Sequence, residues 1–459
     1  MRRILFCGIA LLTCVSCNVV PDYVRPDFYD EATTARELHL KTPQPLPKKW
    51  YCRLGDSQLD NLVEKGLQNS IDIHVAIERL RQARATLNIN TADYLPQVGL
   101  KGGYNYDKYS KNIGTVADSH YYSAGFDASW EFDLWGKGRR QREADEASVL
   151  AAEYTLQDVK NVVAAEIAAA YISLLQNTEN QRFAEQNARL QQDIFATVSA
   201  KYNSGLSDET SYREAQYLLE NTRAQIPQYQ AEVEKYKNAL ATIIGILPSE
   251  LNLTKLPSKL VTPVVNKEEL SAFPLYVVRL RPDVAAAEQK LIMQNALVGA
   301  AVAELYPDVS ISGLWGYAAR GGSKLIRSSS QTYNYAPLLS MPLLDWNKLH
   351  NNIKLQESVR QEAMENYKQA VLNAIAEIRN AQKSYETSKS STRNKYAAWR
   401  SMQTAAELTQ KKYVEGLAEF ADVMRTQQNM LNAQQEYISV LAQTTQNLIA
   451  FYKAIGAPA

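Results

Sequence analysis

Cysteine is scarce in this chain of 459 residues, which has four of them. Cys7 and Cys14 lie in an N-terminal apolar segment that we expect to be cleaved, which leaves Cys17 and Cys52. Two cysteines that lie so close to one end cannot hold a fold of this size together. A disulfide framework is therefore excluded.

Histidine is equally scarce, and no catalytic or cofactor motif is present. The four histidines are scattered, without the HExxH or Cys-His spacing that a metal site requires. The chain also lacks a GxGxxG sequence, a P-loop and a nucleophile elbow. We therefore expect no metal, no cofactor and no enzymatic activity, and the energy for any transport must come from a partner.

Long apolar runs and an excess of one charge are absent as well. Beyond the N-terminal segment, no stretch of about 20 apolar residues could form a membrane-spanning helix. Lys and Arg total 50 against 49 Asp and Glu, a net charge of +1, so no global field attracts the chain to nucleic acid. If the chain enters a membrane, it must do so without such a helix.

The N-terminus is typical of an exported protein. Two arginines and an apolar stretch up to Val15 indicate a signal peptide, which we place at residues 1–16. The following Cys17 resembles the acylated cysteine of bacterial lipoproteins, although Cys14 stands where their lipobox usually has leucine. Asn18 replaces the aspartate that favours inner-membrane retention in such lipoproteins, so we expect lipid attachment at Cys17 and delivery to the outer membrane. The alternative is an ordinary signal peptide with an incidental cysteine.

A proline-rich leader follows at residues 17–60. Proline lacks a backbone N–H donor and interrupts regular structure. The prolines of this segment are Pro21, Pro26, Pro43, Pro45 and Pro47. We expect an extended, lipid-anchored leader that lies along the body of the protein.

The rest of the chain is an internal duplication with a shift of 211 positions. The sequence KYNSGL at residues 201–206 returns as KYVEGL at residues 412–417, and other landmarks align at the same shift without a gap. A constant shift over most of a chain indicates two copies of one structural unit. We place the copies at residues 61–245 and 283–456, with a Pro-rich linker at residues 246–282.

Each copy begins with a helix and a β-hairpin. Helical spacing that starts at the expected N-caps Asp72 and Asp283 is followed by alternation of apolar and polar residues at 97–132 and, more loosely because of Pro337, at 308–342. Strands of about 10 residues suffice to cross a bilayer when tilted. Aromatic residues gather toward the strand ends, as in an interfacial girdle. The alternative is a hairpin of a soluble sheet.

Very long helices follow each hairpin. No glycine interrupts the chain between Gly138 and Gly205, and apolar residues recur at helical spacing, which predicts one helix of roughly 100 Å. Gly205 ends it, and a second helix returns toward Gly245. In the second copy, residues 345–415 contain neither Gly nor Pro, and the helix ends at Gly416. The two recurring sequences are therefore the tips of helical hairpins, near 205 and 416.

This pattern predicts a mainly α protein with a membrane β-barrel. Four strands cannot close a barrel, and an open sheet edge is not tolerated in lipid, so the chain must oligomerise. Barrels begin at about 8 strands, which leaves two, three or four chains possible. A water-filled channel is favoured because the strand face opposite the aromatic residues is small or polar: Ser123, Gly125, Ser129, Ser310 and Ser312.

Short motifs accompany this architecture. They are Pro-Asp-Tyr-x-Arg-Pro at 21–26, Phe-Asp-Leu-Trp-Gly-Lys at 132–137, Arg-Pro-Asp-Val at 281–284, Tyr-Leu-Pro-Gln and Leu-Tyr-Pro-Asp before the strands, and the two Tyr-x-x-Gly-Leu tips. With the lipobox, they resemble the lipoprotein branch of the outer membrane factor (TolC-type) efflux channels over nearly the whole mature chain. The resemblance implies a homotrimer with a 12-stranded barrel in outer membrane lipid and an α-helical periplasmic tunnel. It also implies two protein partners, a periplasmic adaptor and an inner-membrane pump.

The resemblance assigns roles to the tip residues. The Gly205-Leu206 and Gly416-Leu417 turns match those that contact the adaptor in the family. The alternative for each exposed leucine is a local helix-cap contact.

The constriction of the tunnel is assigned in the same way. Asp422 matches an aspartate that forms a constricting ring in the trimer, and Arg425 matches the arginine of the lipoprotein branch. Tyr202 and Tyr413 match tyrosines that bond across tips, whereas Ser211 stands where some members carry an aspartate. The alternative for Asp422 and Arg425 is a solvated ion pair.

The function predicted from the sequence is a passive export duct for small toxic compounds or drugs, in the outer membrane and extending into the periplasm. Two alternatives stay open. One is a duct for type I protein secretion, which the sequence cannot separate from small-molecule efflux. The other is a periplasmic coiled-coil scaffold that does not conduct.

Overall fold

The computed structural model describes residues 22–26, 46–110, 112, 119–253, 260 and 276–459. The signal peptide, the proposed lipid site Cys17 and much of the leader and linker lie outside the described residues. The chain divides into two compact units, each built from three segments. One contains Met1–Asp27, Arg79–Glu153 and Ala286–Lys368, and the other contains Phe28–Glu78, Tyr154–Ala285 and Gln369–Ala459.

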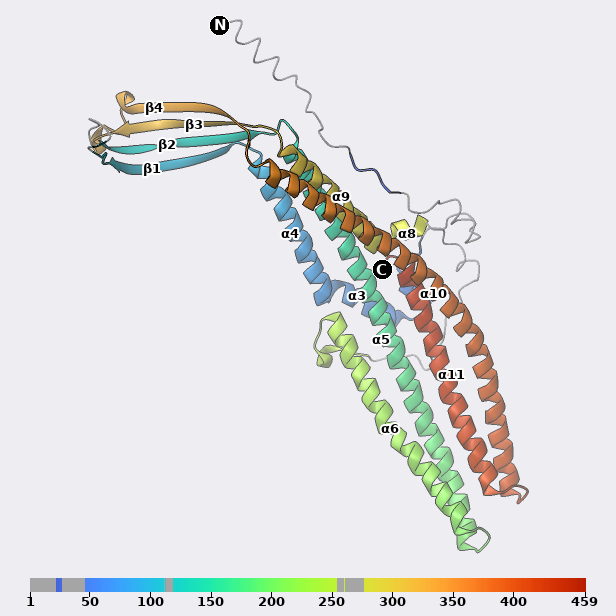
Figure 1. The fold of residues 1–459 in the computed structure, drawn as a ribbon. Coiled ribbons are helices and arrows are strands. Elements are labelled where there is room, and N and C mark those ends of the chain that lie inside the picture. Colours follow the sequence, from blue (N-terminus) through green and yellow to red (C-terminus); the bar gives the residue numbers. More distant parts are fainter. Residues whose placement is uncertain (1–21, 27–45, 111, 113–118, 254–259, 261–275) are drawn as a thin grey trace. The chain divides into compact units, whose positions relative to one another are not determined.

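The first unit contains one antiparallel sheet in the order β1-β2-β3-β4 (Figure 1). The strands are β1 (Gln97–Asp107), β2 (Ser119–Phe132), β3 (Asp308–Ala319) and β4 (Gln331–Ser340). Within each copy the two strands of the hairpin pair with each other, β1 with β2 and β3 with β4. Strand β2 pairs with β3 and so joins the two copies. Pro337 lies in β4, an edge strand, where a missing ladder donor is tolerated.

One face of the sheet is apolar and aromatic. The register places Tyr104 opposite Tyr122, Phe126 opposite Trp315, and Trp315 opposite Tyr333. Residues directly opposite one another in an antiparallel pair share a face, so these rings lie on one side of the sheet. These rings are between 42% and 71% exposed, which is costly in water and favourable against lipid.

The opposite face is polar and has little side-chain volume. Lys101 forms an ion pair with Asp127 at 2.8 Å there. Gly125 pairs with Gly316 across β2 and β3, and a Cβ on Gly316 would lie 2.4 Å from the carbonyl oxygen of Ala124. The close approach of these strands therefore requires glycine. The two-faced alternation that the sequence predicts is present.

Long helical hairpins confirm the duplication. Helix α5 (Lys137–Asn203) and helix α10 (Trp346–Val414) have 67 and 69 residues. Their returning partners, α6 (Glu209–Ile244) and α11 (Phe420–Ala454), have 36 and 35 residues. In the described part of the chain, no helix combines the length and apolar character needed to cross a membrane.

The shorter helices correct several expectations. Helix α4 (Ile71–Asp93) and helix α9 (Pro282–Ala303) begin one residue before Asp72 and Asp283, so these aspartates lie in the first turn and are not N-caps. An acidic side chain in a first turn still interacts favourably with the helix dipole. Helix α8 (Tyr276–Leu280) lies within the Pro-rich linker, where proline content alone does not predict a helix.

The leader also ends differently from the expected extended segment. A 3-10 helix, η1 (Trp50–Leu54), lies within the expected leader. Helix α3 (Ser57–Asn69) begins before the expected end of the leader at residue 60 and continues beyond it. Trp50 and Tyr51 are fully buried, and the Trp50 ring stacks on Tyr452 at 5.5 Å. The leader therefore contributes to the core of the second unit.

Candidate gate and docking tips

The tip of each long helical hairpin is closed by the same backbone motif. The Gly205 N–H donates to the Tyr202 carbonyl at 3.0 Å, and the Leu206 N–H donates to the Lys201 carbonyl at 2.8 Å. The second tip repeats both bonds, from Gly416 to Tyr413 and from Leu417 to Lys412. This pair of bonds defines a Schellman motif, which requires a left-handed residue at its centre. The φ angles of Gly205 and Gly416 are 71° and 77°.

The leucines that follow the two glycines project into solvent. In a Schellman motif this position usually packs against the last turn of its own helix. Leu206 is 77% exposed and Leu417 is 73% exposed, so neither makes a covering contact of that kind. Two exposed leucines at equivalent turns leave an apolar surface available to another protein.

The two tips contact each other within the second unit. Lys201 Nζ, on the first hairpin, donates to the Tyr413 carbonyl at 2.8 Å and lies 4.0 Å from the centre of the Tyr413 ring. A small apolar cluster lies beneath this contact and contains Ile194, Val198, Ala215, Tyr413, Phe420 and Val423. The tips are therefore held together by a cation, a carbonyl and an aromatic ring.

The two tip tyrosines occupy different environments. Tyr413 is 7% exposed and lies edge-on against Phe420 at 5.6 Å, and this burial raises the pKa of its hydroxyl. Tyr202 is 37% exposed and stacks on Tyr212 of its own hairpin at 5.2 Å. Of the two, the structure brings Tyr413 into contact with the other tip.

The predicted gate residues Asp422 and Arg425 lie one turn apart at the start of α11. Arg425 Nη2 donates to Asp422 Oδ1 at 2.7 Å. The side chains are 46% and 71% exposed, so the ion pair contributes little to the stability of one chain. The first turn of a helix suits a carboxylate because the positive end of the helix dipole lies there.

The residues at the equivalent positions of the first tip make different interactions. Asp208 Oδ1 accepts a hydrogen bond from the Ser211 N–H at 2.9 Å, and its hydrogen bonds to Ser211 lower the pKa of Asp208. Glu419, the N-cap of α11, makes no such bond through its side chain. The first repeat therefore uses its acid to cap a helix, whereas the second presents Asp422 on the helix surface.

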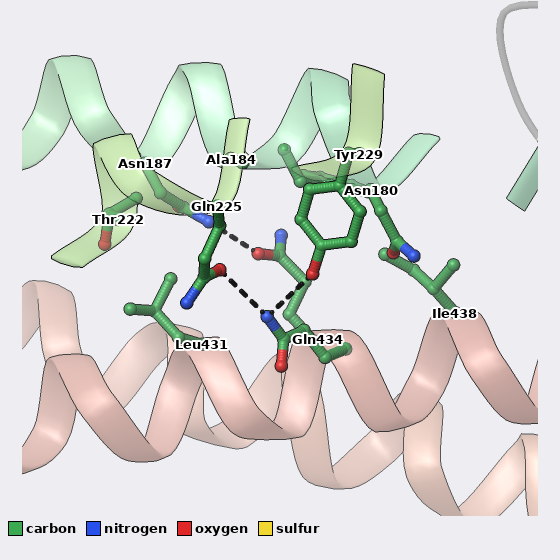
Figure 2. A pocket seen from close by; sticks show the side chains of 11 residues that line it. Asn180, Ala184, Asn187, Thr222, Gln225, Tyr229, Leu431, Gln434 and Ile438 are labelled. Carbon is green, nitrogen blue, oxygen red and sulfur yellow. Dashed lines mark hydrogen bonds between the residues drawn. The ribbon is translucent and has the colours of Figure 1, made fainter. Parts of the chain in front are cut away.

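A partly buried polar seam joins α5 and α6 to α11 (Figure 2). Asn187 Nδ2 donates to Gln434 Oε1 at 2.8 Å, and Gln435 Nε2 donates to the Tyr229 hydroxyl at 3.1 Å. The side chains surround a cavity of about 10 Å³, enough for one water molecule. This cavity is too small for a transported compound. Its hydrogen bonds instead fix how the hairpins align.

Two features of the helical hairpins are not indicated by the sequence pattern. One is the role of Lys201, although a Lys-Tyr pair recurs in both copies, at 201–202 and 412–413. The other is the polar seam, because its glutamines and asparagines are ordinary residues for a helix surface. Among the described residues, no three His, Cys, Asp or Glu side chains gather as a metal site would require.

The chain matches known proteins over almost all of its length. The family model described as "Outer membrane efflux protein" matches residues 62–246 and 278–457. The chain is 25% identical to the cation efflux system protein CusC of Escherichia coli (strain K12), over 98% of each protein. It is 23% identical to the probable outer membrane lipoprotein SilC of Salmonella typhimurium, over 97% of this chain and 96% of SilC. The solved structure of the outer-membrane channel OprN superposes with a TM-score of 0.88 at 28% identity, covering 96% of this chain and 99% of OprN.

Proposed function

Because the chain belongs to the family of outer membrane efflux proteins, we propose that it forms the passive exit duct of a tripartite pump for small toxic compounds. Members of this family are outer-membrane channels of efflux pumps, and this protein is an outer-membrane channel of that class. The observation that carries the proposal is the two-faced sheet, with aromatic residues on one face and glycine and polar residues on the other. Such a sheet suits lipid on one side and water on the other.

The working unit in this proposal is a homotrimer. In the described sheet, β1 and β4 each have one partner strand, so each leaves an outer edge with unpaired backbone groups. Unpaired edges are not tolerated in lipid. Three copies joined β1 to β4 would close a barrel of 12 strands and place the polar face inward.

The lipid anchor in this proposal is Cys17. The leader residues close to it dock on the first unit: Arg25 Nη2 donates to Glu288 Oε2 at 2.9 Å, and Arg140 Nη2 donates to Asp22 Oδ1 at 2.9 Å. Glu288 is 7% exposed and Arg140 is 5% exposed. The name of the relative SilC, an outer membrane lipoprotein, supports acylation in this chain.

The tips serve as docking points and gate in this proposal. The exposed Leu206 and Leu417 would contact apolar residues of a periplasmic adaptor, which in turn binds an inner-membrane pump that supplies the energy. Asp422 from three copies would surround the threefold axis, where mutual repulsion is partly offset by the neighbouring Arg425. A ring of carboxylates favours the passage of cations.

Liposome swelling tests the proposal against its two alternatives. Purified protein is reconstituted into vesicles, and the entry of sugars of increasing size is compared with that of a small unfolded protein. A duct for small compounds admits sugars up to a size limit. Vesicles that stay closed to all solutes, even after Asp422→Ala and Arg425→Ala, would contradict a channel and support a scaffold. Entry of the unfolded protein would favour secretion instead.

A further inference from the structure

The connection between β3 and β4 carries an unbalanced positive charge. Between Asp308 and Asp345 the chain contains three cations and no acidic residue. The cations are Arg320, Lys324 and Arg327, and all three side chains are exposed. Elsewhere on the surface, cations commonly pair with a nearby carboxylate, as Lys235 does with Glu232 at 3.0 Å.

None of the three cations has a partner among the residues that the structure describes. No ion pair or side-chain hydrogen bond joins Arg320, Lys324 or Arg327 to a described carboxylate. Three uncompensated cations within eight residues give this loop a locally positive electrostatic potential. An arrangement of this kind is stabilised when an anion binds between them.

The backbone of this loop is shaped by its own hydrogen bonds. Two short 3-10 turns, η4 (Gly322–Lys324) and η5 (Ser328–Ser330), follow each other. The Ser330 hydroxyl donates to the Lys324 carbonyl at 2.8 Å, and the Ser330 N–H donates to the Arg327 carbonyl at 2.9 Å. Ser330 therefore holds the segments that carry Lys324 and Arg327 together, so these two cations belong to one folded surface.

The position of the loop indicates what it faces. The opposite ends of the strands connect to α9 and α10, so this loop lies at the end of the sheet away from the helices (Figure 1). Tyr317 and Tyr333 lie near the ends of β3 and β4 that adjoin the loop. Aromatic girdles mark the level of lipid head groups in a membrane barrel. The cations follow these aromatic residues along the chain, and in the proposed orientation of the sheet they would lie at the level of head-group phosphates.

One apolar side chain completes this surface. Ile326 is 85% exposed between Lys324 and Arg327. An exposed branched side chain between two cations suits a ligand that offers both phosphate and acyl chain. A soluble anion could be bound by the arginine and lysine side chains alone, without an exposed apolar side chain between them.

We propose that the loop formed by residues 320–330 binds the phosphates of the glycolipid in the outer leaflet of the outer membrane. Arg320, Lys324 and Arg327 contact the phosphates, and Ile326 packs against the lipid. The inference rests on the proposed orientation of the sheet in the bilayer. It extends the proposed function, because it adds a lipid partner on the outer surface.

Lipid binding by the detergent-purified full-length protein tests the proposal. The probe is lipid A with two phosphates, and the comparison lipid is the same molecule with both phosphates removed. The variant Arg320→Gln/Lys324→Gln/Arg327→Gln should bind the phosphorylated probe about 100-fold more weakly, since each cation near an anionic surface contributes about five-fold. The dephosphorylated lipid should bind weakly and equally to wild type and variant.

A matched control removes the same charge elsewhere. Arg223, Lys235 and Lys237 on α6 each form an ion pair with a glutamate three residues earlier, and their triple Gln variant should bind the probe as wild type does. An unchanged affinity of the loop variant would overturn the proposal, and so would equal binding of both lipids by wild type. Displacement of the probe by millimolar inorganic phosphate would also overturn it, in favour of a soluble anion. Vesicle swelling by the loop variant shows separately that the channel is intact.

Discussion

Gly205 and Gly416 are required by backbone conformation and not by lack of space. Both have a φ in the left-handed region, and a Cβ on either would meet nothing within 4 Å. Gly321 offers a matched comparison, because its surroundings are equally open but its φ is −119°. Substitutions at these three glycines therefore separate the free-energy cost of backbone strain from that of steric crowding.

We expect Gly416→Ala to destabilise the fold by about 1 kcal/mol, since an L side chain in the left-handed region is strained by that amount. Gly205→Ala should behave alike, whereas Gly321→Ala should change stability by less than about 0.5 kcal/mol. Thermal unfolding in detergent, followed by circular dichroism, measures the three differences. Equal effects in all three variants would show that the Schellman geometry does not set the cost.

Asp158, on α5 in the second unit, has surroundings that disfavour the ionised form of its carboxyl group. Burial is the main cause that raises its pKa, the carboxylate of Asp283 adds to the rise, and Arg281 opposes it. A carboxyl whose pKa is higher in the folded state than in the unfolded state reduces stability as the pH rises through that range. The ionised form therefore costs stability at neutral pH.

We expect Asp158→Asn to raise stability at pH 7, by about 1 kcal/mol or less. The advantage should vanish as the pH falls below the ordinary aspartate value of 3.8, where both states of the wild type are protonated. Unfolding curves recorded across this pH range test the sign. The exposed Asp193→Asn on the same helix is the control, and an advantage that grows on acidification would contradict the account.

At the scale of elements, the periodicity of the sequence was a good guide to the long helices and the strands. The absence of Gly and Pro predicted α5 and α10, and alternation predicted all four strands, including β4 with Pro337. The start of the body was predicted less well. Trp50 and Tyr51 lie in a Pro-rich stretch without periodicity, and the Trp50 ring packs on Tyr452, which is distant in sequence.

The candidate site was predictable where it is local in sequence. The Gly-Leu turns follow from the recurring tip sequences, because a glycine that ends a long helix favours a left-handed cap. The contact of Lys201 with Tyr413 joins residues 212 positions apart, and no local pattern reports it. The assignment of Asp422 and Arg425 to a gate stays a prediction, because it concerns three copies of the chain.

The exposed tip leucines lead to a prediction about the hairpins as docking elements. Leu206→Ser and Leu417→Ser should leave stability within about 0.5 kcal/mol of wild type, because both side chains are already in water. Cross-linking to the adaptor, and export that depends on it, should be lost. Leu408→Ser, 55% exposed on α10, is the control. Unchanged cross-linking in the tip variants would exclude these turns as the docking points.

At the scale of the whole molecule, the duplication supplies two hairpins and two tips, and the divergence between copies distinguishes them. The first tip caps α6 with Asp208, and the second presents Asp422 and Arg425 on the surface of α11. Glu209 and Arg213 form a comparable exposed ion pair at the first tip, at 3.2 Å. The first-tip pair is therefore an internal control for the gate.

Single-channel conductance in planar bilayers measures both the pore and its gate. We expect the purified wild-type oligomer to conduct weakly. The Asp422→Ala/Arg425→Ala variant should conduct several-fold more and lose its preference for cations, because the carboxylate ring is removed. Glu209→Ala/Arg213→Ala should conduct as wild type does. The absence of any conducting path in all three proteins would contradict a channel, and an equal increase in both double variants would contradict a gate at Asp422.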